Sequence, residues 1–290
     1  MDLQLSRLNL IGFARREAAY NMALDKYLLD LGEAAAGAAG GAPDAAGSAG
    51  AAREGYLRFY DWMKPTITLG HSEPLENIDH EKALEDGLEI VRRPTGGRAV
   101  LHWGDVTYAV VLPARTGKDL SELYKLISEC IIEGAGLIGL DLELERGILG
   151  KSGARDKPCF ASVSRYEISY RGRKVVGSAQ RIGEGAMLQH GSIPVDRSYL
   201  KIVDYMRFAG TGDTDRARER LRREIEGSTA CLEDASGGPL DPAAVRAALA
   251  QGFQARLECE AVEIDPPEIK SGPQSKPVAE SGVSRRKPKR

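Results

Sequence analysis

The chain has 290 residues, and its 40 Lys and Arg against 42 Asp and Glu leave a formal net charge of −2, which favours neither nucleic acid nor a membrane as a partner. It has no apolar run of 18 residues and no apolar N-terminal signal segment, which disfavours membrane spanning and secretion. Its four cysteines lie far apart without a CxxC pair, which indicates reduced thiols in a cytoplasm rather than disulfides or a zinc cage.

The first predicted element is a helix, because apolar residues recur at helical spacing over residues 16–31. Residues 32–53 are almost purely Ala, Gly, Ser and Pro, a composition that predicts a flexible insertion in a loop. Aromatic and β-branched residues then predict strands over 56–61 and 66–70, and a helix is expected over 73–86.

A glycine turn separates the next strands. We expect a strand over residues 88–92 and two more over 98–102 and 106–112. Gly104 and Asp105 stand between the last two, and this pair predicts that they form a hairpin.

The middle of the chain begins with an amphipathic helix over residues 119–136. Cys130 lies on its apolar side, and we interpret it as a small core residue. A hairpin is expected across Arg171 and Gly172. The remaining expected elements are strands over 166–170, 173–176, 186–189 and 191–194 and mostly helical structure over 196–249.

This pattern and the length predict one α+β domain with a small appendage. We place the catalytic domain at residues 1–230, including the insertion at 32–53. A small helical and strand extension follows at 231–264, and a disordered basic tail at 265–290.

The first candidate functional segment is residues 92–102, which carry paired glycines between two expected strands. Gly96 and Gly97 let a backbone approach a ligand closely, and Arg93 and Arg98 offer charge-assisted hydrogen bonds. The alternative is a plain glycine turn with solvated arginines. The segment matches neither GxxxxGK[ST] nor a GxGxxG that opens a helix, so a phosphate loop or dinucleotide fingerprint is not predicted.

A lone cysteine, Cys159, lies among cations and glycines rather than in an apolar periodic segment. Nearby positive charge lowers the pKa of a thiol and makes it a nucleophile. Lys174 follows fifteen residues later, in the expected hairpin, and its ammonium group could stabilise the thiolate. Spacing alone equally allows Lys174 to be an ordinary exposed strand lysine.

Histidine supplies the third candidate, His190, which stands between Gln189 and Gly191. It could orient a substrate or donate a hydrogen bond to a developing oxyanion, or be a satisfied core histidine. The other histidines show no metal-ligand spacing with one another, so no metal site is predicted.

Six segments together resemble the biotin/lipoate protein ligase superfamily, and within it the cysteine-containing octanoyltransferases of Gram-positive bacteria (LipM type). The resemblance spans residues 15 to 230 without the insertion, and the order of six motifs is far more specific than any one. The matching segments are 21–25, 65–70, 92–102, 159–160, 172–180 and 189–192.

The resemblance implies an α+β fold with a mixed sheet flanked by helices. It implies transfer of an octanoyl group from acyl carrier protein to a lysine of a lipoyl domain, such as glycine cleavage H protein, in lipoate biosynthesis, without ATP or a metal. The family's thioester cysteine falls on Cys159, and its pKa-lowering lysine on Lys174. The residues that it places at the acyl pocket are Arg93, Thr95, Gly96, Gly97 and His102, with Gly177, Ser178 and Ala179 as further candidates.

Three other functions stay open. An ATP-dependent lipoate–protein ligase has the same fold, would use ATP and Mg²⁺ and needs no cysteine, and the short polar segment after residue 230 disfavours its accessory domain. An amidotransferase that moves lipoyl or octanoyl groups between lipoyl domains also uses a cysteine. A non-catalytic binding module would keep the fold without Cys159 and Lys174.

Overall fold

The computed structural model describes residues 5–38, 54–114, 119–146, 166–208 and 213–269. Its largest unit is a six-stranded sheet in which β12, β1 and β2 run parallel and β2, β6, β11 and β10 run antiparallel. The predicted α+β fold with a mixed sheet is confirmed. In sheet order the strands are β10 (Gly177–Ile182), β11 (Ala186–Pro194), β6 (Asp105–Pro113), β2 (Glu54–Trp62), β1 (Arg7–Arg16) and β12 (Glu260–Ile264).

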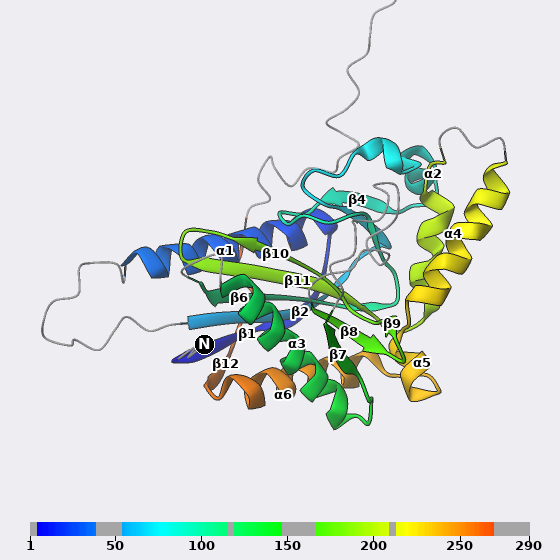
Figure 1. Ribbon diagram of the computed structural model, residues 1–290. Helices are drawn as coiled ribbons and strands as arrows, with labels where there is room; N and C mark the ends of the chain where they lie inside the picture. The colour runs from blue at the N-terminus through cyan, green and yellow to red at the C-terminus, as the bar shows by residue number, and fades with distance from the viewer. Residues whose placement is uncertain (1–4, 39–53, 115–118, 147–165, 209–212, 270–290) are drawn as a thin grey trace, which may run out of the picture.

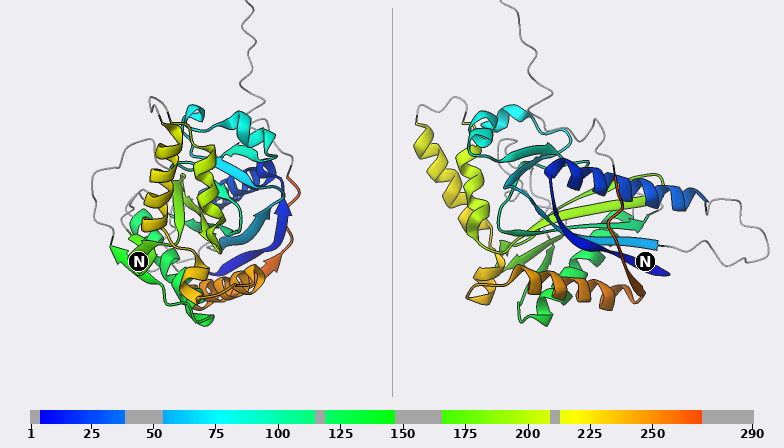
Figure 2. Two further views of the ribbon diagram at one scale, coloured as in Figure 1. Left: turned by 90° about the vertical axis from the view of Figure 1, so that its right-hand side faces the viewer. Right: turned by 180° about the vertical axis from the view of Figure 1, so that it is seen from behind.

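Helices cover both faces of this sheet (Figure 1). Helix α1 (Ala18–Ala38) lies on one face, and α3 (Asp119–Leu137) and α6 (Pro242–Leu257) lie on the other, as the rear view also shows (Figure 2). The alternation of side chains along a strand produces these two layers. On β6, Tyr108 and Val110 enter the core under α3 and α6, whereas Ala109 and Val111 pack against α1.

Helix α1 confirms the predicted helix over residues 16–31 and continues to residue 38, into the segment predicted as an insertion. The alanines at its end explain the extension, because alanine has the highest helix propensity. Residues 39–53, the rest of that segment, lie outside the described residues.

Two smaller sheets flank the large one. The first has the order β4 (Glu89–Arg92), β3 (Thr66–Leu69) and β5 (Val100–His102). It shares a separate apolar core with α2 (His80–Glu85), the 3₁₀ helix η3 (Arg197–Tyr205) and α4 (Thr214–Ser228). The second has the order β7 (Glu143–Arg146), β8 (Tyr166–Tyr170) and β9 (Arg173–Lys174).

Two local predictions are wrong. The strands on either side of Gly104 form no hairpin, because β5 pairs with β3 while β6 pairs with β2 and β11. Gly104, at φ +70°, turns the chain from the small sheet into the large one. The helix expected over residues 73–86 is broken into η1 (Leu75–Asn77) and α2, since Asp79 caps a new helix by accepting from the backbone N–H of Lys82.

The hairpin across Arg171 and Gly172 is confirmed, and both residues have positive φ, as a tight two-residue turn requires. The strands expected over 186–189 and 191–194 form one continuous strand, β11. Cys130 is a core residue, as predicted, with no exposed surface.

Beyond residue 230, α5 (Leu232–Ser236) leads to α6, which packs against α3, and β12 then adds a parallel strand beside β1. In the described part of the chain, no helix is long and apolar enough to cross a membrane.

Candidate active site

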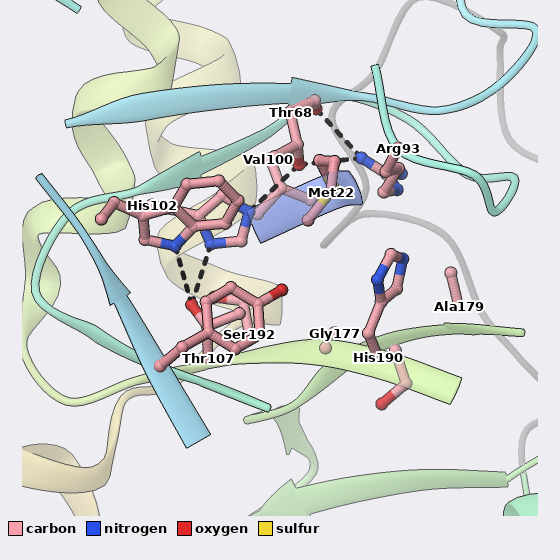
Figure 3. Close-up of a pocket in the computed structure, with 14 residues that line it drawn as sticks. Met22, Thr68, Arg93, Val100, His102, Thr107, Gly177, Ala179, His190 and Ser192 are labelled. Atoms are coloured by element: carbon pink, nitrogen blue, oxygen red, sulfur yellow. Dashed lines mark hydrogen bonds between the residues drawn. The ribbon is translucent and has the colours of Figure 1, made fainter. Parts of the chain in front are cut away.

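A pocket that opens to solvent lies between the large sheet and the small β4-β3-β5 sheet, and its space, open solvent included, is about 360 Å³. Helix α1 contributes Met22, and the edge strand β10 and its neighbour β11 contribute six more lining residues. His102 and His190 stand on opposite sides of this space (Figure 3). The lining residues are Met22, Tyr60, Trp62, Thr68, Arg93, Val100, His102, Thr107, Gly177, Ser178, Ala179, His190, Gly191 and Ser192.

His102, at the end of β5, is held by partners on both ring nitrogens. Its Nδ1 lies 2.8 Å from Oδ2 of Asp105, and its Nε2 lies 3.0 Å from the Thr68 hydroxyl. A carboxylate accepts hydrogen bonds, so Nδ1–H donates to Asp105, and Nε2 is hydrogen-bonded to the Thr68 hydroxyl. The ring of Trp62 packs over the imidazole at 4.5 Å between centroids.

The carboxylate of Asp105 gathers three donors at the base of the pocket. Besides His102, it accepts from the hydroxyls of Ser192 at 2.7 Å and Thr107 at 3.0 Å. The Thr107 oxygen in turn accepts from Nε1 of Trp62 at 2.9 Å. His102, Thr107, Ser192 and Trp62, which line the pocket, therefore direct these polar atoms into its wall rather than into the pocket.

His190, on β11, is also bound at both nitrogens. Its Nδ1 lies 2.7 Å from Oδ2 of Asp25, and its Nε2 lies 2.6 Å from the Thr95 hydroxyl. Burial lowers the pKa of His190, more strongly than the hydrogen bond to Asp25 raises it, so the imidazole is neutral at pH 7. Thr95 and His190 are 1% and 4% exposed.

Arg93, which lines the pocket, holds the glycine segment in place through hydrogen bonds. Its buried guanidinium donates to the carbonyl oxygens of Gly96 and Arg98 and, through Nη1, to the carbonyl and hydroxyl of Thr68. The solvated-arginine alternative is therefore wrong for Arg93. Gly97 has φ +93°, a conformation that L side chains rarely adopt.

Gly70, which directly follows β3, packs against the glycine segment, and sequence reasoning left it without a role. A Cβ at Gly70 would lie 1.8 Å from the carbonyl oxygen of Gly97, a backbone atom. We expect Gly70→Ala to displace the glycine segment and lower the free energy of unfolding in urea by about 1–3 kcal/mol. Gly136→Ala, at an exposed helical position with open space, is the control and should leave that free energy unchanged or raise it. Equal urea midpoints for the two variants would contradict this account.

The structure brings most of the predicted substrate contacts together. Arg93, His102, Gly177, Ser178, Ala179 and His190 line the pocket. Thr95, Gly96 and Gly97 are not among its lining residues, but Thr95 is hydrogen-bonded to His190 and Gly96 to Arg93. The Ser178 hydroxyl is bonded to the Tyr108 phenol at 2.8 Å, within the core under α3 and α6.

Of the two residues predicted to be catalytic, the structure describes only Lys174. Lys174 is 8% exposed, so the alternative of an exposed strand lysine is wrong, and its Nζ donates to Glu167 at 2.9 Å. It is not among the residues that line the pocket. Cys159 lies outside the described residues, and the roles of both side chains stay predictions.

Sequence reasoning also assigned no part in the site to Asp25, Arg58 or Asp105. A signal was present for Asp25, which falls on the same helical face as Met22 and Leu28, both in the core. Arg58 lies two residues before the buried Tyr60 on the same strand, and this spacing places both side chains on one face. Charged residues at core-facing positions are costly to bury and therefore indicate a buried network.

The sequence-family model of the lipoyl protein ligase A/B catalytic domain matches residues 17–254. The chain is 39% identical over 215 residues to the octanoyltransferase LipM of Kyrpidia tusciae, which covers 70% of this chain and 77% of the relative. It is 33% identical over 257 residues to the octanoyltransferase LipM of Halalkalibacterium halodurans, with 83% and 84% covered.

Solved structures show the same fold at lower identity. The bi-partite lipoate protein ligase of Thermoplasma acidophilum is similar with a TM-score of 0.66 and 20% identity, over 91% of this chain and 88% of that one. A lipoate-protein ligase A bound with ATP is similar with a TM-score of 0.65 and 21% identity, over 91% and 90%.

Proposed function

This chain belongs to the lipoyl protein ligase A/B catalytic domain family, and on that basis we propose that it is an octanoyltransferase of lipoate biosynthesis. The observation that carries the proposal is the chemistry of the pocket wall. The hydroxyls of Thr68, Thr107 and Ser192 and the rings of His102 and His190 all have partners within the wall. A wall whose polar atoms are satisfied presents carbon to the pocket, which suits an aliphatic acyl chain.

The donor that we propose is octanoyl-acyl carrier protein, and the acceptor is a lysine of a lipoyl domain, such as that of glycine cleavage H protein. Curated relatives named octanoyltransferase LipM support the acyl group. The bi-partite ligase of Thermoplasma acidophilum forms a lipoylation system with its E2 lipoyl domain, which supports the class of acceptor. We place the reaction in the cytoplasm, where thiols stay reduced.

The reaction proceeds in two acyl transfers at the sulfur of Cys159. Its thiolate attacks the thioester carbonyl of the donor, a new C–S bond forms, and the pantetheine C–S bond breaks with its electron pair leaving as thiolate. The neutral amine of the acceptor lysine then attacks the enzyme thioester, the Cys159 thiolate leaves, and the proton lost by the nitrogen ends on the pantetheine thiolate released in the first transfer. One thioester replaces another and an amide is the product, so the two transfers consume no ATP and require no metal ion.

The other three thiols are poor candidates for the nucleophile. Burial raises the pKa of Cys130 to about 12, and it also raises the pKa of Cys231 and of Cys259. A thiol with a raised pKa holds less thiolate at neutral pH. This supports Cys159 as the nucleophile. The role of Lys174 as the cation that favours its thiolate rests on the family resemblance, and in the structure its Nζ donates to Glu167.

A lipoate–protein ligase is the second candidate, because structures of the same fold include a ligase bound with ATP. Intact mass spectrometry separates the two functions. We expect one octanoyl group on the protein after incubation with octanoyl-acyl carrier protein alone, and its transfer to an added lipoyl domain. Modification of the lipoyl domain only with ATP, Mg²⁺ and free octanoate or lipoate would contradict the transferase. An amidotransferase would instead take its acyl group from an octanoylated lipoyl domain.

A further inference from the structure

Asp25 is a buried carboxylate that lies behind the pocket wall. It comes from α1, has no exposed surface, and its Oδ2 lies 2.7 Å from Nδ1 of His190. The sheet register explains this contact, because Arg58, Ala109 and His190 are cross-strand neighbours on β2, β6 and β11. The small Ala109 belongs to the core beneath α1, so the carboxylate of Asp25 reaches the residues on both sides of it.

The hydrogen bonds around Asp25 have a definite direction. The Tyr60 hydroxyl lies 3.2 Å from Oδ2 and donates to it, whereas Nε of Arg58 forms an ion pair with Oδ1 at 3.3 Å without a hydrogen bond. A carboxylate paired with a guanidinium accepts and does not donate, so the proton between Asp25 and His190 belongs to Nδ1 of the imidazole. Because His190 is neutral, its Nε2 carries no proton and accepts from the Thr95 hydroxyl.

Thr95 connects this chain of hydrogen bonds to the glycine segment. Its carbonyl oxygen accepts from the backbone N–H of His71 at 2.8 Å, and its side chain is held by His190. Gly96 follows directly and is held through its carbonyl oxygen by Arg93. In the Nδ1–H tautomer the Thr95 hydroxyl donates to Nε2, whereas in the other tautomer Nδ1 would face the Asp25 carboxylate as a second acceptor and Nε2–H would donate to Thr95. Asp25 therefore fixes the direction of the hydrogen bond that joins His190 to the glycine segment.

We infer that Asp25 is a positioning residue for acyl transfer: it selects the Nδ1–H tautomer of His190, whose Nε2 then holds Thr95 and the glycine segment against the acyl pocket. The inference rests on the proposed function for its effect on rate, and on geometry alone for its effect on the tautomer. Asp25 acts through His190 and touches no substrate. Its effect is large because a displacement of about 1 Å in a positioning element costs about 10²-fold in rate.

The kinetic test removes one hydrogen-bonding group at a time and measures octanoyl transfer. Thr95→Val keeps the volume of the side chain and removes the hydroxyl, and we expect kcat for octanoyl transfer to fall by about 10²-fold with a smaller change in KM. The acyl chain still enters an apolar pocket, whereas its carbonyl is displaced. Thr95→Ser restores the hydroxyl and should recover most of the lost kcat.

Asp25→Asn tests the other end of the chain. It should lower kcat to a similar degree, and the double variant Asp25→Asn/Thr95→Val should be no slower than the slower single variant, because both act through one hydrogen bond. Asp30→Asn makes the same change on the exposed face of α1, where Asp30 pairs only with Lys26 among the described residues, and should leave kcat unchanged.

A spectroscopic test does not require activity. Long-range ¹H–¹⁵N correlation spectra of protein labelled at histidine nitrogens report the tautomer of each of the four histidines, and His190→Gln assigns the signals. We expect His190 as the Nδ1–H tautomer in the wild type and in Thr95→Val. In Asp25→Asn, where the carboxylate no longer selects it, we expect this tautomer to lose its dominance.

The outcomes separate this inference from the proposed function. A wild-type protein without octanoyl transfer overturns the function, while the tautomer spectra still decide the role of Asp25. Wild-type transfer with an unchanged kcat in folded Thr95→Val overturns the inference alone. Folded Asp25→Asn with an unchanged His190 tautomer overturns the inference as well. So does a double variant whose fold-loss in kcat equals the product of the fold-losses of the two single variants.

Discussion

Replacing Cys159 by alanine should lower the rate of octanoyl transfer by at least about 10³-fold, because loss of a covalent nucleophile leaves only the binding and orientation of the two substrates. Cys159→Ser should be nearly as slow. A serine hydroxyl is almost fully protonated at neutral pH, and nothing in the segment around residue 159 supplies a histidine to act as its base. The measurement is the initial rate of lipoyl-domain octanoylation, with the octanoyl adduct followed by intact mass.

Cys259→Ser is the matched control for this experiment. Cys259 is a half-buried free thiol whose pKa is raised by burial, so it should contribute nothing to transfer. We expect the adduct on Cys259→Ser and none on Cys159→Ala. Full transfer by Cys159→Ala would contradict the thioester mechanism and would indicate that the acceptor amine attacks the donor thioester directly.

Breaking the buried ion pair behind the pocket should have the largest effect on stability. Arg58 and Asp25 are 2% and 0% exposed, and the guanidinium also lies 3.6 Å from the centroid of the Tyr60 ring. Arg58→Met keeps the apolar stem and removes the charge, which leaves the Asp25 carboxylate buried without its cation. We expect the free energy of unfolding in urea to fall by about 3–5 kcal/mol, as for other buried pairs that lose one partner.

Two comparisons identify the cause of that loss. In Arg58→Met/Asp25→Asn no uncompensated charge is buried, so the double variant should recover part of the stability that Arg58→Met loses. Arg15→Met breaks the more exposed pair with Asp61 and should cost at most about 1 kcal/mol. Equal losses for Arg58→Met and Arg15→Met would show that the buried pair adds nothing beyond an exposed one.

Local patterns predicted most elements correctly because their causes are local. The helix that contains Asp25 and the helix that contains Cys130 follow from apolar spacing, and the turn at Arg171 and Gly172 follows from the conformational freedom of glycine. The same local reasoning failed at Gly104. A turn residue shows that the chain changes direction, but not which strand the next segment pairs with.

The site shows the same division. The glycine segment at 92–102, His102 and His190 were predicted from their residue types and from a family resemblance, and the structure places them around one pocket. Their partners were not predicted. Asp25 is separated from His190 by 165 residues, and Thr95 from His190 by 95, so no local pattern links them.

The sequence by itself determined the fold class, the glycine segment and the candidate nucleophile, because periodicity, glycine content and the ordered motifs are properties of neighbouring residues. Only the tertiary structure decided what the polar side chains of the pocket do. The register of β2, β6 and β11 sets Arg58, Ala109 and His190 in one row, and the packing of α1 on that row brings Asp25 between them. Directions of hydrogen bonds, and hence the tautomer of a buried histidine, follow from such contacts and from nothing that is written along the chain.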